Sequence, residues 1–141
     1  MISGLSHVTL IVRDLERAAT LLVSALDARE IYSSGDRTFS LSREKFFMLG
    51  EMWLCLMEGE PPKERSYAHI ALQVPEEELD GYLARLIAAG AEIRPDRARI
   101  GAEGRSVYFY DFDNHLFELH AGGLNARLTL YGAAVPGIEE I

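Results

Sequence analysis

Cysteine is almost absent from this sequence, and so is any long apolar run. The single Cys55 cannot form a disulfide within one chain, which fits a reducing cytoplasm as the place where the protein works. No stretch approaches the roughly 20 consecutive apolar residues of a membrane-spanning helix, so we expect no membrane association. The sequence passes from Met1 directly into a strand-like pattern, and we therefore expect no signal peptide.

Positive charge is also scarce. The chain has 14 Lys and Arg against 22 Asp and Glu, and its net charge of −8 argues against nonspecific binding of nucleic acid. Low-complexity segments are missing as well. What is present, 141 residues of which 48% are hydrophobic, suffices for one domain with a core. The tail over residues 128–141 is apolar but weakly patterned, and we expect it to lie against a neighbouring element.

An internal repeat is the most informative feature of the chain. Residues 5–31 and 67–93 align without a gap at an offset of 62 positions. The alignment places His7 on His69, each within a strand-like run. Two half-domains related by a pseudo-twofold axis would bring these imidazoles together at their shared surface. The repeat therefore predicts two similar modules with a common site.

Each copy of the repeat predicts a strand followed by a helix. Residues 6–12 alternate as a strand does, and apolar residues recur at helical spacing over 15–26, after Asp14 as a plausible N-cap. The second copy predicts a strand over 68–74 and a helix over 79–87. Three further strand-like stretches follow each helix, so each module has the order βαβββ.

The predicted fold class is α+β. Two tandem βαβββ modules, about residues 1–60 and 66–127, would form a single domain over 1–141 whose cup-shaped mixed sheet surrounds a metal site. A module of this size leaves a wide sheet face exposed. We therefore expect the modules to pair, and two chains to form a homodimer.

Glu118 supplies a carboxylate to accompany the two histidines. It lies among the apolar strand residues of HLFELHA, where an unpaired charge is costly and a metal cation would compensate it. His7, His69 and Glu118 therefore form a candidate metal site. At the same offset Leu56 falls on Glu118, and because leucine cannot ligate a metal, coordination positions stay open, as in catalytic centres.

The paired modules with this histidine, histidine and glutamate set resemble the vicinal oxygen chelate superfamily of glyoxalase I, extradiol dioxygenases and bleomycin-binding proteins. Within it, ISGLSHVTLIV, WLCL, SYAHIA and EGRSVYFYDFDNHLFELHAGGLNARL are similar to segments of fosfomycin-resistance proteins. The segment YSSGDRTFSLSREKFF places Glu44 where the FosX type, a Mn(II)-dependent fosfomycin epoxide hydrolase, has its general base. The resemblance implies Mn(II) on the three ligands (other divalent metals being possible), no organic cofactor, fosfomycin as substrate and Glu44 as the catalytic residue.

The resemblance also implies a set of substrate-binding side chains. Thr9 lies two residues from His7 and so shares its strand face. This position independently supports Thr9 as a substrate-binding residue. Arg97 or Arg99 is expected to replace a loop lysine of glutathione-using relatives, since a guanidinium suits a phosphonate. The implied set is Thr9, Trp53, Tyr67, Arg99, Ser106, Tyr108 and Arg127.

Three other functions stay open. A thiol transferase would add glutathione or another thiol to the same epoxide, although Glu44 would then stand in the path of the thiol. A non-catalytic protein that sequesters a drug would not need the three metal ligands. An Fe(II) oxygenase is also compatible with two histidines and one carboxylate. Turnover of fosfomycin with and without a thiol distinguishes these functions.

Overall fold

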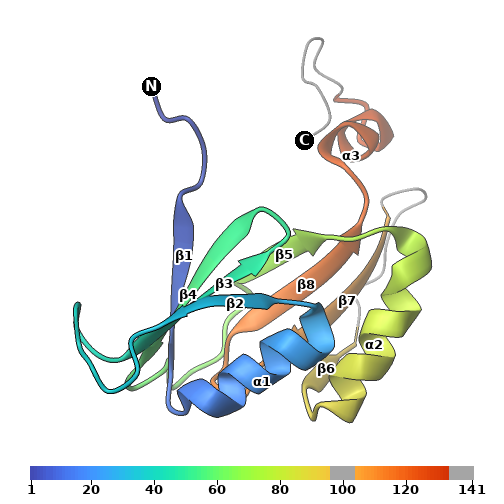
Figure 1. Ribbon diagram of the computed structural model, residues 1–141. Helices are drawn as coiled ribbons and strands as arrows, with labels where there is room; N and C mark the ends of the chain where they lie inside the picture. The colour runs from blue at the N-terminus through green and yellow to red at the C-terminus, as the bar shows by residue number, and fades with distance from the viewer. Residues whose placement is uncertain (96–103, 134–141) are drawn as a thin grey trace.

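The computed structural model describes residues 1–95 and 104–133, and there the chain forms two four-stranded sheets (Figure 1). The first module consists of β1 (His7–Val12), α1 (Leu15–Leu26), β2 (Arg29–Ser33), β3 (Glu44–Leu49) and β4 (Met52–Glu58). The second consists of β5 (His69–Gln73), a 3-10 turn (Glu76–Glu78), α2 (Leu79–Ala88), β6 (Glu92–Arg94), β7 (Arg105–Tyr110) and β8 (Leu116–Ala121). The α+β class and both βαβββ modules are confirmed. The helix α3 (Leu124–Leu130), which follows β8, was not predicted.

The two sheets have the same strand order, β1-β4-β3-β2 and β5-β8-β7-β6, as the repeat predicts. The pairs β1–β4 and β5–β8 are parallel, and the other neighbours are antiparallel. This order leaves β1 and β5 at the edges of their sheets, and each begins with a histidine, His7 or His69. An edge strand has backbone groups available for pairing with another chain.

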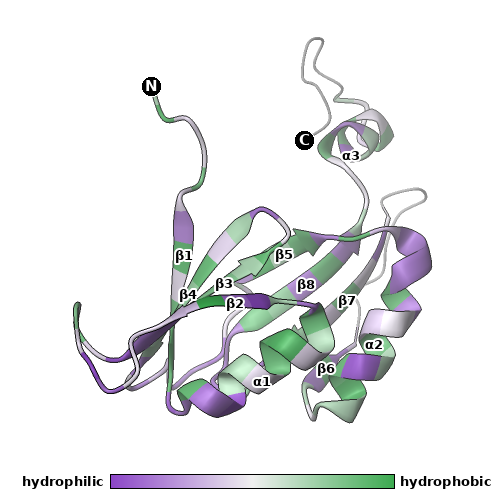
Figure 2. Cartoon of the chain, in the orientation of Figure 1, coloured by the Kyte–Doolittle hydropathy of each residue, from purple (hydrophilic) through white to green (hydrophobic). Residues whose placement is uncertain are grey.

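The two long helices lie together on one side of the sheets (Figure 1). Leu22 of α1 and Leu86 of α2 are buried in the common core, together with Phe47 and Phe117 of the sheets. Hydrophobic segments run through both α1 and β8 in Figure 2. Asp14 caps α1 as predicted, since its side chain accepts a hydrogen bond from the backbone N–H of Arg17 at 3.1 Å. The opposite faces of the sheets are thus left to carry a site.

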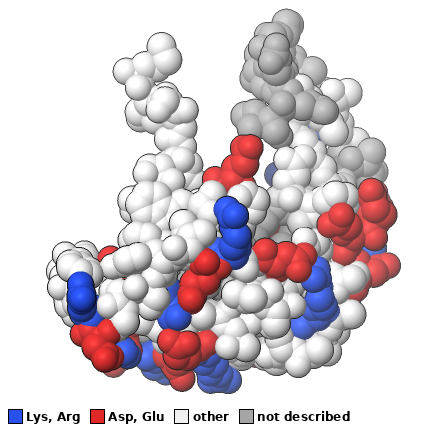
Figure 3. Space-filling model, viewed as in Figure 1, with Lys and Arg blue, Asp and Glu red and all other residues white. Residues whose placement is uncertain are grey.

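Polar contacts also join the modules. Arg85 of α2 donates to Asp27 at the end of α1 at 2.7 Å, and this hydrogen bond holds the pKa of the Asp27 carboxyl below its usual value. Because the pair is exposed, it contributes about 1 kcal/mol or less. Acidic and basic side chains are interspersed on the surface shown in Figure 3. No helix in the described part of the chain is long and apolar enough to cross a membrane.

The register of the strands corrects one sequence-based assignment. Thr9 pairs with Cys55 in the first sheet, whereas its repeat counterpart Ala71 pairs with Glu118 in the second. Cys55, and not Leu56, is therefore the structural counterpart of Glu118. The offset grows by one residue between the first and last strands of the module, and adjacent strand residues face opposite ways. Leu56 accordingly lies in the core with 2% exposure.

Candidate metal and substrate site

His69 and Glu118 lie together on the second sheet, with His69 Nε2 3.0 Å from Glu118 Oε2. The other ring nitrogen, Nδ1, is 2.7 Å from the carbonyl oxygen of Tyr67. A carbonyl only accepts, so Nδ1 carries the proton and, in the neutral ring, Nε2 presents a lone pair to the carboxylate. Two facing acceptors require a positive charge between them. A divalent transition metal fits this pair, since imidazole and carboxylate are among its usual ligands.

Ser106 holds the same carboxylate from its other side. The Ser106 hydroxyl donates to Glu118 Oε1 at 2.5 Å, and both residues are buried. One oxygen of Glu118 is thus fixed by a hydrogen bond while the other faces His69. The orientation of the carboxylate is therefore set by the fold itself.

His7 lies on the first sheet, apart from this pair. Its ring packs on Trp53 with 4.3 Å between centroids, and Ser6 Oγ is 3.1 Å from its Nδ1. Within residues 1–95 and 104–133 of one chain, no group of three His, Cys, Asp or Glu side chains is placed to hold a metal ion. Folding of one chain thus brings His69 and Glu118 together without His7, and ligation by His7 stays a prediction.

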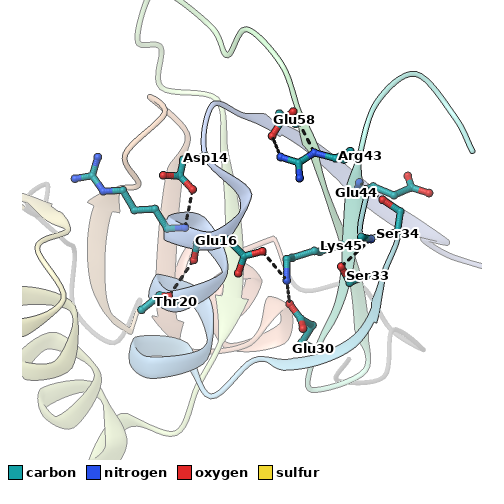
Figure 4. A network of polar contacts seen from close by, with 12 residues as sticks. Asp14, Glu16, Thr20, Glu30, Ser33, Ser34, Arg43, Glu44, Lys45 and Glu58 are labelled. Carbon is teal, nitrogen blue, oxygen red and sulfur yellow. Dashed lines mark hydrogen bonds and ion pairs between the residues drawn. The ribbon is translucent and has the colours of Figure 1, made fainter. Parts of the chain in front are cut away.

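Glu44 lies on the same sheet face as His7. In the register of the first sheet, Thr9 pairs with Cys55, whose Sγ donates to Glu44 Oε2 at 3.8 Å. The carboxylate is largely buried, with the residue 8% exposed. Figure 4 shows the side chains of Glu44 and Lys45 pointing away from one another, as consecutive strand residues do. Among residues 1–95 and 104–133, the weak thiol of Cys55 is the one side-chain donor to this carboxylate, so lone pairs remain that can accept a proton.

Cys55 itself is expected to be unreactive. Burial, followed by the nearby Glu44 charge, raises the pKa of its thiol to about 11. Since the thiolate is the nucleophile, iodoacetamide at pH 7.5 should alkylate Cys55 at least about a hundredfold more slowly than free cysteine, whose pKa is about 8.5. The rate should rise as pH increases toward 11. Intact-protein mass spectrometry measures this, and alkylation at the rate of free cysteine would contradict the buried, protonated thiol.

Three of the predicted substrate-binding residues surround the His69–Glu118 pair besides Ser106. The Tyr67 and Tyr108 hydroxyls are 3.2 Å apart, and the Tyr108 ring lies 5.6 Å from that of His69. Arg127 of α3 borders a pocket of about 290 Å³ that His69 and Glu118 also line. A cation and two phenols next to a candidate metal position can bind an oxyanion such as a phosphonate.

The other predicted substrate-binding residues are distributed differently. Thr9 and Trp53 lie on the first sheet, and Arg99 falls outside the described residues. Sequence reasoning missed Arg94 as a residue of this site. Its guanidinium lies 5.0 Å from the centre of the Tyr67 ring, which adds a second cation beside the Tyr67 and Tyr108 pair. Arg94 stands in a crowded run of arginines, and only the pairing of β6 with β7 distinguishes it from them.

Gly104 limits what the site can tolerate at the start of β7. Its φ is +95°, and a Cβ there would overlap the carbonyl oxygen of Ala121 and lie 3.1 Å from His120 Cε1. We expect Gly104→Ala to lower the free energy of unfolding by about 2 kcal/mol or more, measured by urea denaturation. Gly81→Ala in α2 is the control, because a Cβ there meets nothing within 4 Å and should stabilise by about 0.5–1 kcal/mol. Equal stability of both variants would contradict the close approach at Gly104.

Comparison with known proteins gives consistent matches. The family model for the Glyoxalase/Bleomycin resistance protein/Dioxygenase superfamily matches residues 4–119. The fosfomycin resistance protein FosX of Listeria innocua serovar 6a is 61% identical over 131 residues, covering 93% of this chain and 98% of the relative. FosX of Mesorhizobium japonicum is 54% identical, covering 92% and 93%. A solved variant of FosX from Listeria monocytogenes, complexed with Mn(II) and 1S,2S-dihydroxypropylphosphonic acid, has a TM-score of 0.85 at 54% identity, over 93% of this chain and 99% of that one.

Proposed function

Because the chain belongs to the Glyoxalase/Bleomycin resistance protein/Dioxygenase superfamily, we propose that it is a Mn(II)-dependent hydrolase that adds water to the epoxide of fosfomycin. The product is a vicinal diol phosphonate, and loss of the epoxide confers resistance to the antibiotic. One observation carries this conclusion: the similar solved FosX holds Mn(II) together with a dihydroxypropylphosphonic acid. Addition of water gives such a diol, whereas addition of a thiol would give a thioether.

We assign Mn(II) to His69, Glu118 and His7. The facing acceptors His69 Nε2 and Glu118 Oε2, 3.0 Å apart, support a cation at this position. When bound, a divalent metal acts as a Lewis acid that favours departure of the epoxide oxygen from carbon. Ser106 contributes by fixing the second carboxylate oxygen. Cys55, the counterpart of Glu118 in the first sheet, has a thiol whose pKa is raised to about 11 by burial, so without a metal it carries no charge at neutral pH.

The third ligand, His7, is assigned to a second copy of the chain. Strands β1 and β5 are both edge strands, with His7 and His69 as their first residues. Laying β1 of one copy beside β5 of the other, along the pseudo-twofold relation of the modules, would bring these histidines together. The apolar side chain of Leu5, 74% exposed just before β1, also supports burial against another chain. A homodimer would then contain two such sites.

Glu44 is assigned as the general base. It shares a sheet face with His7, so in this dimer both reach the site from the partner subunit's first sheet. An epoxide opens by attack from the side opposite its C–O bond, and Glu44 would accept the proton of the attacking water as the new C–O bond forms. The epoxide oxygen keeps the electron pair of the broken bond and takes a proton from solvent water, and Glu44 releases the proton it accepted back to solvent. Thr9, Tyr108 and Arg127 would hold the phosphonate during this step. Ser106, which the sequence also suggested as a substrate-binding residue, donates its one hydroxyl proton to Glu118 and would instead orient that carboxylate.

Phosphorus NMR of the purified protein with fosfomycin and Mn(II) tests the function. The expected result is the diol resonance both with and without glutathione. A product that forms only with glutathione would identify a thiol transferase instead. A fosfomycin signal that persists in both samples would reject the proposed reaction and leave a drug-binding role to be measured by calorimetry.

The proposed location is the cytoplasm. The only cysteine is buried and unpaired, as expected for a protein folded in a reducing compartment. The proposed binding partner is the small-molecule substrate, fosfomycin. The net charge of −8 gives no support to binding of nucleic acid.

A further inference from the structure

A row of three hydrogen bonds connects α3 to Glu118 through His120. Arg127 Nη2 lies 3.2 Å from His120 Nε2, and His120 Nδ1 lies 2.7 Å from Ser106 Oγ. Ser106 Oγ is in turn 2.5 Å from Glu118 Oε1. Glu118 and His120 are two residues apart in β8 and so share one sheet face, and His120 is only 8% exposed.

The chemistry of the four groups fixes the direction of these bonds. Ser106 has one hydroxyl proton, and the carboxylate of Glu118 can only accept it. Ser106 must therefore accept from His120, which places a proton on His120 Nδ1. The guanidinium of Arg127 can only donate, so His120 Nε2 must hold a lone pair. The row is satisfied only by a neutral His120 protonated at Nδ1, with every donor directed from Arg127 toward Glu118.

We propose that His120 is a positioning residue that joins substrate recognition to metal binding. One ring nitrogen holds Arg127 at the edge of the pocket, and the other orients Glu118 through Ser106. This inference rests on the proposed function for the roles of Arg127 and Glu118. The hydrogen bonds themselves are properties of the chain, so they can be tested without turnover.

The pocket explains why such a link is useful. Its volume is about 290 Å³, and Glu118, His120 and Arg127 all line it. Arg127 belongs to α3, a short helix that stands apart from the sheets in Figure 1 and is joined to β8 by Gly122 and Gly123. The hydrogen bond to His120 ties the guanidinium to the sheet that carries Glu118. The distance between the Arg127 guanidinium, which would bind the phosphonate, and the Glu118 carboxylate, which would bind the metal, is thereby fixed.

Two substitutions at position 120 separate the two halves of the link. In His120→Asn the amide can replace Nδ1 as donor to Ser106 but is too short to reach Arg127. In His120→Gln the amide oxygen can replace Nε2 as acceptor for Arg127, while the bond to Ser106 is lost. We expect His120→Asn to keep the Mn(II) Kd within about threefold and raise KM for fosfomycin about tenfold or more. We expect His120→Gln to weaken Mn(II) binding about 10–100-fold while KM at saturating Mn(II) stays within about threefold.

The measurements are Mn(II) titration followed by EPR of free Mn(II), steady-state kinetics, and nitrogen-15 NMR of the histidine rings in metal-free protein. The NMR spectrum should show His120 as the Nδ1-protonated tautomer. Equal losses in both variants, losses in neither, or an Nε2-protonated His120 would overturn the proposal. If His120→Gln does not fold, Ser106→Ala replaces it, and this variant should show the same loss of Mn(II) affinity.

His115→Asn is the matched control. His115 lies on the same hairpin, and its Nδ1 donates to Asp111 Oδ2 at 2.7 Å, away from the pocket-lining residues, so the substitution should change neither Kd nor KM. The wild-type protein separates the two levels of inference. If it binds Mn(II) but leaves fosfomycin intact, the proposed function fails, while the NMR tautomer and the Mn(II) affinities of the variants still decide the role of His120.

Discussion

Glu44→Gln should lower kcat for hydration of fosfomycin about 10²–10⁴-fold, because removal of a general base has an effect of that size. The Mn(II) Kd should stay within about twofold, since Glu44 is not a proposed metal ligand. Glutamine has nearly the same shape as glutamate. Its amide oxygen can still accept the hydrogen bond that Cys55 Sγ donates to Glu44 Oε2 at 3.8 Å. The fold should therefore persist, and the loss should appear in kcat and not in the thermal midpoint.

Glu58→Gln serves as the control for this substitution. Glu58 lies on the adjacent strand β4, where it pairs with Arg43 at 2.5 Å, and its side chain is 37% exposed. Turnover should be unchanged there. Phosphorus NMR gives the rate, and Mn(II) titration gives the affinity. Undiminished hydration by Glu44→Gln would remove this carboxylate from the mechanism. Loss of Mn(II) binding would instead make it a ligand.

The repeat made most of the fold predictable. The alternation in residues 6–12 and 68–74, each followed by helical spacing, indicated two βαβββ modules, and both sheets have the same order. Neither a fixed offset nor residue type could give the register of β4, however. Leu56 and Cys55 are neighbours, and a shift of one residue decides which of them faces the candidate site.

The geometry of the candidate site was only partly predictable, and the roles of its residues stay predictions. His69 and Glu118 are held in one sheet by the parallel pairing of β5 and β8, a local relation that the repeat anticipates. His7 belongs to a different sheet. The sequence does not indicate whether His7 meets the His69–Glu118 pair of its own chain or that of a second chain. Likewise, from the sequence His120 can be either a surface residue or one that lies behind the metal ligands. Its role depends on hydrogen-bond directions that only the three-dimensional arrangement supplies.

Mixed dimers of two inactive variants should recover activity if His7 comes from the partner. His7→Ala and Glu118→Gln should each lose Mn(II)-dependent turnover, because each removes one of the three proposed ligands. In a heterodimer of the two, one site carries both substitutions, whereas the other combines intact His7 with intact Glu118. Coexpression with two different affinity tags isolates this species. Its kcat per dimer should be about half that of the wild type.

A heterodimer of His69→Ala and Glu118→Gln is the decisive control for this experiment. Both residues belong to the same sheet, with Nε2 and Oε2 3.0 Å apart, so every site of that heterodimer lacks one of them and should stay inactive. If His7 acted within its own chain, the first heterodimer would be inactive as well. Recovery in the first and none in the second therefore requires a site shared between two chains. Inactivity of both would place His7 in its own subunit's site or outside the metal centre, and the Mn(II) Kd of His7→Ala distinguishes these two cases.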